Sequence, residues 1–232
     1  MNVLLAGVGG QGVVLVSKIL AIASIRSGID VRVGEKHGLA QRGGSVTSHL
    51  RLNSELGVII PKGRGDILLG FEPLEAYRNI EFMSKDSLKI VNENPIFSPS
   101  NFLGTDPYPQ IDWGEFSNLF LVNIDELSEK IKLPKSKNIM MLGFLFNLAD
   151  EVGVALPIPE EIVREVVKEN APKGTAEQNL FAFEEGKRAL FKSVEMGHTP
   201  PYARDINNGI DYSSRPKTGI LGLDADLAQV DG

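Results

Sequence analysis

The fold class is decided by the stretch VLLAGVGGQG, residues 3–12, and by the apolar segment 13–26 that follows it. Residues 3–6 are a short, wholly apolar run, which is typical of a buried parallel strand. Residues 13–26 carry apolar side chains at helical spacing, and Gly28 stands where a glycine favours the end of a helix. Residues 31–33 are predicted to be the next strand. The pattern predicts a β-α-β unit, which implies a right-handed crossover and a parallel sheet.

Later segments extend this architecture. The pattern predicts a half-exposed strand at 46–52, buried strands at 67–69, 88–91 and 119–122, an irregular excursion at 92–118, and helices at 73–80, 139–152, 159–170 and 176–194. We therefore expect an α/β fold: a three-layer, Rossmann-like domain with a mainly parallel sheet over residues 1–194, whose C-terminal half is helical.

The last segment, 195–232, is expected to be an extended tail. It carries Gly, Pro, Asn and Ser without sustained periodicity, which is typical of a flexible tail. Its apolar residues, such as Tyr202, Tyr212 and Leu221, favour an arm that binds a partner. Both interpretations stay open.

Composition excludes several classes of protein. The chain has 232 residues, with 24 Lys+Arg against 30 Asp+Glu and a net charge of -6, which argues against nucleic-acid binding. No apolar run approaches the roughly 20 residues that span a bilayer, and the start does not resemble a signal peptide, so we expect a cytoplasmic protein without a membrane partner. The chain has no cysteine, so it cannot build a thiolate zinc site or an iron–sulfur cluster, and its three histidines are too scattered for an obvious metal site.

The first loop has a direct chemical use. Gly7, Gly9 and Gly12 fit G-x-G-x-x-G between a strand and a helix, and a helix N-terminus offers N–H groups to an anion. Glu35 ends the second strand, where a dinucleotide-binding protein places its ribose acid. Alone, this pattern favours an NAD or FAD site. The alternative is that the glycines only allow close packing of the helix on the strand.

A second loop, residues 35–45, gathers polar groups. It offers the Glu35 carboxylate, the His37 imidazole, the Gln41 amide and the Arg42 guanidinium, and it ends in Gly43-Gly44-Ser45. Arg42 suits a carboxylate or phosphate, and the glycines let backbone amides approach a ligand. His37 and Arg42 are the candidate catalytic residues, although His37 lacks a visible nucleophile partner. The alternative is a solvated surface loop.

Together the two loops resemble the indolepyruvate:ferredoxin oxidoreductase beta-subunit family, within the gamma-type subunits of 2-oxoacid:ferredoxin oxidoreductases. The matching stretches are GVGGQGVVLVSKIL (7–20), GEKHGLAQRGGSVTSHLR (34–51), IIPKGRGDILLGFEPLEAYR (59–78) and NIMMLGFL (138–145). The run HGLAQRGGSVTSHLR is the most specific, and it favours the aryl-pyruvate branch. The tail lies outside the resemblance.

The resemblance implies a small subunit that binds no cofactor alone and is not active alone. Such complexes convert a 2-oxoacid and coenzyme A to acyl-CoA and CO₂ and pass electrons to ferredoxin. Thiamine diphosphate, Mg²⁺ and [4Fe-4S] clusters are then expected in a large alpha-subunit partner, in an α₂β₂ assembly, with coenzyme A at the interface. The run Gly63-Arg64-Gly65-Asp66 is a poor match to a diphosphate motif, and we expect it to lead into a strand.

We expect both loops to face the partner and to bind coenzyme A phosphates or line the thiamine cleft. The candidate binding residues are Gly7, Gly9, Gly10, Gln11, Gly12, Glu35, His37, Gln41, Arg42, Gly43, Gly44 and Ser45. The loops could instead form only subunit interface. Glu72 and Glu75 follow a predicted strand and could lie near the site, although acidic residues also stabilise a helix N-terminus. Two alternative functions stay open: a stand-alone NAD or FAD oxidoreductase, and a purely structural subunit. The choice of substrate among indolepyruvate, phenylpyruvate and phenylglyoxylate also stays open.

Overall fold

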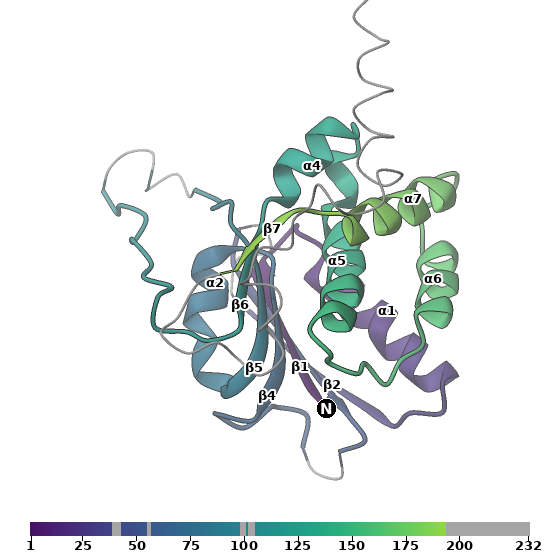
Figure 1. The fold of residues 1–232 in the computed structure, drawn as a ribbon, viewed down its shortest axis with the longest axis horizontal. Coiled ribbons are helices and arrows are strands. Elements are labelled where there is room, and N and C mark those ends of the chain that lie inside the picture. Colours follow the sequence, from purple (N-terminus) through teal and green to yellow (C-terminus); the bar gives the residue numbers. More distant parts are fainter. Residues whose placement is uncertain (39–42, 55–56, 98–100, 102–104, 194–232) are drawn as a thin grey trace, which may run out of the picture.

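A seven-stranded sheet lies between two layers of helices (Figure 1). The computed structural model describes residues 1–38, 43–54, 57–97, 101 and 105–193. The strands are β1 (Asn2–Val8), β2 (Val31–His37), β3 (Ser45–Leu52), β4 (Gly65–Gly70), β5 (Met83–Asn92), β6 (Leu119–Val122) and β7 (Phe191–Ser193). The α-helices are α1 (Val13–Arg26), α2 (Pro73–Arg78), α4 (Ile124–Lys130), α5 (Lys137–Glu151), α6 (Glu160–Glu169) and α7 (Ala176–Lys187), with short 3-10 helices at Ile80–Phe82 and Pro134–Ser136.

The strand order is β2-β3-β1-β4-β5-β6-β7. The neighbours β1, β4, β5 and β6 are parallel, whereas β3 is antiparallel to both β1 and β2, and β7 is antiparallel to β6. Five of these seven strands therefore run in one direction, and the predicted three-layer fold with a mainly parallel sheet is confirmed. The sequence did not indicate that β3 separates the two strands of the β-α-β unit.

Each face of the sheet has its own apolar core. The larger core packs side chains such as Leu5, Leu69 and Ile90 against α1, α5, α6 and α7. The smaller core packs Leu4 and Leu68 on the other face, beneath α2. Because both faces are covered, the central strands are continuous apolar runs.

β3 is not half-exposed as predicted, because both of its faces are covered. Ser48 is fully buried, and its hydroxyl lies 2.6 Å from that of Ser17 on α1. On the other face, Nδ1 of His49 accepts the Ile60 N–H at 3.3 Å, and its ring meets the edge of Phe82. The alternation of polar residues in β3 thus reflects buried hydrogen bonds rather than solvent.

The C-terminal helices differ from prediction at one end. The predicted helix 176–194 ends at Lys187, and Phe191–Ser193 instead adds β7 beside β6. α7 crosses α5 very closely: a Cβ added to Gly143 would lie 2.0 Å from the Phe183 carbonyl oxygen.

Two further segments complete the comparison with the sequence. The helix α4 was not predicted. The tail 195–232 lies outside the described residues.

Candidate functional site

A cavity of about 580 Å³ opens at the carboxyl ends of β1, β4 and β5. The chain leaves β1 towards α1 on one face and leaves β4 towards α2 on the other, so the cavity lies at the topological switch point of the sheet. We call it the switch-point cavity. It is lined by Val8, Gly9, Gly10, Gln11, Gly43, Phe71, Asn92, Asn94, Pro95, Ile96, Ile124, Asp125, Pro134, Lys135, Lys137, Asn138 and Met141.

The two loops singled out in the sequence meet at this cavity. The N–H of Gly9 donates to the Gly44 carbonyl at 2.8 Å, and the N–H of Gly43 donates to the Gly9 carbonyl at 3.3 Å. These bonds bind the glycine loop to the turn between β2 and β3. They also use the Gly9 N–H, which a dinucleotide site of this pattern would offer to phosphate.

The Gln11 side chain connects two strand ends at the edge of the cavity by hydrogen bonds. Its Oε1 accepts the Val8 N–H at 2.8 Å, and its Nε2 donates to the Phe71 carbonyl at 2.8 Å. The side chain thus holds together the ends of β1 and β4. Gly7 leaves room for it, because a Cβ there would lie 2.7 Å from Gln11 Oε1 and 3.0 Å from the Phe71 Cβ.

Gly12 brings α1 against the start of α5. Its φ of 80° is left-handed, and a Cβ there would lie 2.2 Å from Nδ2 of Asn138. The backbone conformation therefore favours glycine at this position, and a Cβ would also displace the Asn138 side chain. Asn138, the second residue of α5, consequently lies directly against the N-terminus of α1.

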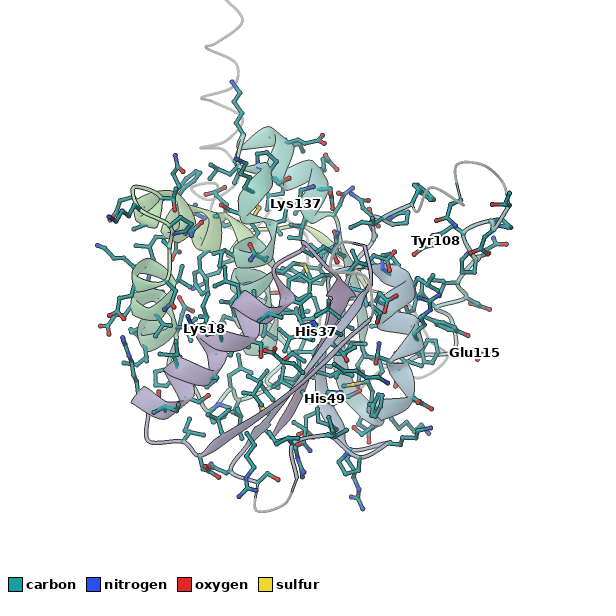
Figure 2. The ribbon with its side chains drawn as sticks, turned by 180° about the vertical axis from the view of Figure 1, so that it is seen from behind. Lys18, His37, His49, Tyr108, Glu115 and Lys137 are labelled. Carbon is teal, nitrogen blue, oxygen red and sulfur yellow. The ribbon has the colours of Figure 1, made fainter. Side chains whose placement is uncertain are left out.

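A polar network forms the side of the cavity beneath α4. Asn92 Nδ2 donates to Asp125 Oδ2 at 2.8 Å, and Lys137 forms an ion pair with Asp125 Oδ1. Burial alone would raise the pKa of Asp125, but the hydrogen bonds from Lys137 and Asn92 outweigh it and lower that pKa. Asp125 is therefore an ionised, fully engaged carboxylate at neutral pH. Figure 2 shows Lys137 at the end of the sheet where α4 and α5 begin.

Glu35 and His37 do not line this cavity. They lie on β2, and Nε2 of His37 is 3.4 Å from Oε2 of Glu35. Glu35 is paired with Ser48, which is paired with Leu5 in the middle of β1. Glu35 is thus about two strand spacings, roughly 10 Å, from β1 and away from the glycine loop. This is not the ribose-acid position of a dinucleotide fold, where the second strand is adjacent to the first.

Other predicted residues have simpler places. Gly44 supplies the carbonyl to Gly9 described above, and the Ser45 carbonyl accepts the Gly38 N–H at 2.8 Å. Gln41 and Arg42 lie outside the described residues.

The acidic residues after β4 stabilise a helix. The Glu72 carboxylate caps α2 by accepting the Glu75 N–H at 2.9 Å and also accepts the Tyr108 hydroxyl at 2.7 Å. Glu75 pairs with Arg78 at 2.7 Å. Neither glutamate lines the switch-point cavity, so the helix-terminus interpretation is confirmed.

The Gly63–Asp66 run leads into β4, as predicted. Asp66 Oδ2 accepts the Asn2 N–H at 2.6 Å, at the opposite end of the strand from the cavity. It therefore holds the start of β1 and takes no part in the site.

Sequence reasoning missed the polar lining residues Asn92, Asn94, Asp125, Lys135 and Asn138. A signal was present, because polar residues directly follow the predicted strands at 88–91 and 119–122. The carboxyl ends of parallel strands share one edge, so this rule would have placed Asn92 and Asp125 beside the glycine loop.

Two features are absent from the described parts of the chain. No group of three or more His, Cys, Asp or Glu side chains there could hold a metal ion. No helix among these residues is both long and apolar enough to cross a bilayer.

The sheet, its two helical layers and the cavity at the switch point define an α/β domain whose cavity lies where open sheets of this class bind ligands. A family model described as pyruvate ferredoxin/flavodoxin oxidoreductase matches residues 2–189, and the chain belongs to this family. Its curated relatives are oxidoreductase subunits. The indolepyruvate oxidoreductase subunit IorB of Archaeoglobus fulgidus is 35% identical over 192 residues, covering 80% of this chain and 93% of the relative. The 2-oxoglutarate synthase subunit KorC of Methanocaldococcus jannaschii is 30% identical over 185 residues, covering 78% of this chain and 89% of the relative.

Solved structures share the fold. The gamma subunit of a keto/oxoacid ferredoxin oxidoreductase from Geobacter sulfurreducens superposes with a TM-score of 0.57 at 21% identity, covering 81% of this chain and 96% of that chain. A 2-oxoglutarate:ferredoxin oxidoreductase from Magnetococcus marinus, solved with 2-oxoglutarate, coenzyme A and succinyl-CoA, gives a TM-score of 0.60 at 21% identity. Here the match covers 81% of this chain and 30% of that chain.

Proposed function

We propose that the chain is the small subunit of a 2-oxoacid:ferredoxin oxidoreductase that acts on aryl pyruvates, indolepyruvate among them. The complex would convert the oxoacid and coenzyme A to acyl-CoA and CO₂ and pass two electrons to ferredoxin. One observation carries this proposal: the family match over most of the chain is accompanied by higher identity to indolepyruvate oxidoreductase subunits than to 2-oxoglutarate synthase subunits.

The residues of this chain fit a supporting role in that chemistry. Without cysteine it supplies no thiolate ligand for an iron–sulfur cluster. Among the described residues, Asp125 is the only carboxylate that lines the switch-point cavity, and Lys137 and Asn92 already engage it, so this lining does not fit a magnesium–diphosphate site. We therefore assign thiamine diphosphate, Mg²⁺ and the clusters to a large alpha subunit in an α₂β₂ complex.

Coenzyme A fits this chain better than those groups do. The cavity is lined by the glycine loop and by two lysines, Lys135 and Lys137, which together suit the phosphates of the co-substrate. The glycine loop and the loop 35–45 would approach the partner there, with Gln41 and Arg42 contributing to binding. A stand-alone dinucleotide enzyme is disfavoured by β3, which separates Glu35 from β1, and by the bond that uses the Gly9 N–H.

Purification of the tagged chain from its native host tests the proposal. The proteins that co-purify are identified by mass spectrometry, and the sample is assayed with indolepyruvate, phenylpyruvate, phenylglyoxylate, 2-oxoglutarate, coenzyme A and a viologen dye. We expect a large thiamine-binding, cysteine-rich partner and dye reduction that needs both an aryl oxoacid and coenzyme A. A lone chain that retains a dinucleotide, or a complex that prefers 2-oxoglutarate, would contradict the proposal.

A further inference from the structure

The two edges of the sheet are not equally protected. β7 at one edge has three residues, whereas β2 at the other edge has seven. β2 pairs along its whole length with β3, and no other described strand pairs with it. A long edge strand presents backbone N–H and C=O groups that another chain can pair with, whereas a very short one presents few. The outer side of β2 is therefore a candidate contact surface.

Exposed apolar side chains gather at the middle of this edge strand. Val33 is 36% exposed and lies on the face of the larger core, because it is paired with Leu50. The next residue, Gly34, points to the other face. A Cβ added to Gly34 would lie 3.0 Å from the Val58 carbonyl oxygen and 3.1 Å from Cδ1 of Ile59, and these two residues are 45% and 47% exposed. We call Val33, Val58 and Ile59 the edge strip, because they cover both faces of the strand at one level.

The charges at the ends of β2 fit a second copy of the same strand. Two antiparallel copies are related by a two-fold axis perpendicular to the sheet, and one residue then lies opposite itself. If that residue is Val33, Asp30 of each copy lies opposite Lys36 of the other. Asp30 extends the strand, because its carbonyl accepts the Asn53 N–H at 2.8 Å, and its carboxylate lies 3.9 Å from Arg32. Lys36 is exposed and forms no ion pair with a described residue.

The neighbouring registers put like charges opposite each other. With Gly34 at the axis, Arg32 would lie opposite Lys36 of the second copy. With Arg32 or Glu35 at the axis, that residue would lie opposite itself. Like charges directly opposite are destabilising, whereas opposite charges stabilise a pair of strands. Of these four registers, only the one centred on Val33 therefore joins opposite charges, and it also brings the edge strips of the two copies together.

We propose that β2 pairs antiparallel with β2 of a second copy of this chain, about a two-fold axis at Val33. The two sheets then form one continuous sheet. The edge strips make an apolar centre, and the Asp30–Lys36 pairs make a charged rim, which is the usual anatomy of a protein interface. The inference goes beyond the proposed function, because it concerns the contact between two small subunits and holds whichever oxoacid the complex converts.

Oxidative cross-linking of the full chain tests the register. The chain has no cysteine, so a single introduced thiol can form a disulfide only with its copy. Val33→Cys should give a disulfide-linked dimer with diamide, because the Cα atoms of directly opposite residues are about 5 Å apart, within the range of a disulfide. Glu35→Cys is the matched control on the same face of the same strand. Its two copies would be four residues apart, about 13 Å, which is too far for a disulfide.

Sedimentation velocity tests the charge pairs. We expect the wild-type chain to form a dimer, and Lys36→Asp to raise the dissociation constant roughly tenfold, because two attractive pairs become repulsive. Adding Asp30→Lys to Lys36→Asp restores opposite charges and should restore the dimer. Lys85→Asp is the charge-matched control, since this exposed lysine lies on β5, four strands along the sheet.

Each outcome decides for or against the dimer. A wild-type chain that sediments as a monomer at every concentration, or a Val33→Cys variant that cross-links no faster than Glu35→Cys, overturns the inference. If circular dichroism shows that Val33→Cys does not fold, the charge variants decide, and a double variant as weak as Lys36→Asp contradicts the register. The proposed function is judged separately. A monomeric chain in an active complex leaves that function standing, whereas a dimer without a thiamine-binding partner contradicts that function alone.

Discussion

Lys89 is a buried cation whose titration should control the pH dependence of stability. It lies in β5, is 3% exposed, and donates from Nζ to the carbonyls of Ser87 and Ser117, both at 3.0 Å. Burial lowers the pKa of this ammonium group to about 8, although the nearby charge of Asp86 acts in the opposite direction. The folded chain therefore releases this proton at a lower pH than the unfolded chain does.

The magnitude follows from the two pKa values. The unfolded chain holds the proton up to about 10.5, whereas the folded chain releases it near 8. Between these values the unfolded state binds more protons, so the free energy of unfolding rises with pH, by about 3 kcal/mol over the whole interval. Measurement should stay below pH 10, because burial and the bond to Glu72 raise the pKa of Tyr108, and stability conferred by a protonated tyrosine falls above that pH.

Urea denaturation of the wild type and of Lys89→Met measures the pH-dependent contribution of Lys89 to the free energy of unfolding. From about pH 7.5 to about pH 9.5, the stability of the wild type relative to the variant should increase by about 2 kcal/mol. Lys85→Met is the matched control, because Lys85 is an exposed lysine of the same strand, and it should keep the wild-type slope. Equal slopes for Lys89→Met and the wild type would refute the assignment.

Three further predictions concern packing, acid stability and the site. Gly143→Ala should lower the free energy of unfolding in urea by about 1–3 kcal/mol, since its Cβ would lie 2.0 Å from the Phe183 carbonyl oxygen. The control Gly114→Ala, in a loop, should change this free energy little. Equal stabilities of the two variants would contradict the packing argument. His49→Gln should reduce the loss of stability below pH 6.5. Burial, and then the charge of Lys36, lower the pKa of His49 in the folded chain, so the unfolded chain takes up this proton first as the pH falls. The same dependence of stability on pH in the variant and the wild type would contradict this prediction. Arg42→Ala should raise the KM for coenzyme A or the oxoacid in the purified complex, and unchanged KM values would exclude a ligand role.

The strands and helices could be read from the sequence wherever burial is continuous. The runs at 67–69 and 119–122 are wholly apolar because both faces of the sheet are covered, and the structure confirms both strands. β3 was misjudged because buried Ser48 and His49 resemble solvent-facing residues in a local pattern. Their hydrogen-bond partners are distant in sequence, so the alternation did not reveal them.

The site could be predicted in part. Gly9, Gly10, Gln11 and Gly43 do line the cavity, because a glycine turn between a strand and a helix always lies at the carboxyl end of that strand. Whether these residues bind a ligand stays a prediction. Asn138 escaped notice because it directly precedes the apolar helical stretch predicted at 139–152, and only the packing of α5 against Gly12 brings it to the cavity.

The sequence by itself determined the β-α-β start, the layered α/β class and the absence of thiolate ligands, since these depend on local periodicity and residue type. The tertiary structure alone decided that β3 separates β1 from β2 and that the start of α5, which lines the cavity, lies against Gly12. Both depend on contacts between segments far apart in the chain, for example Gly12 with Asn138. Such contacts are set by the packing of whole elements, which no local pattern of residues records.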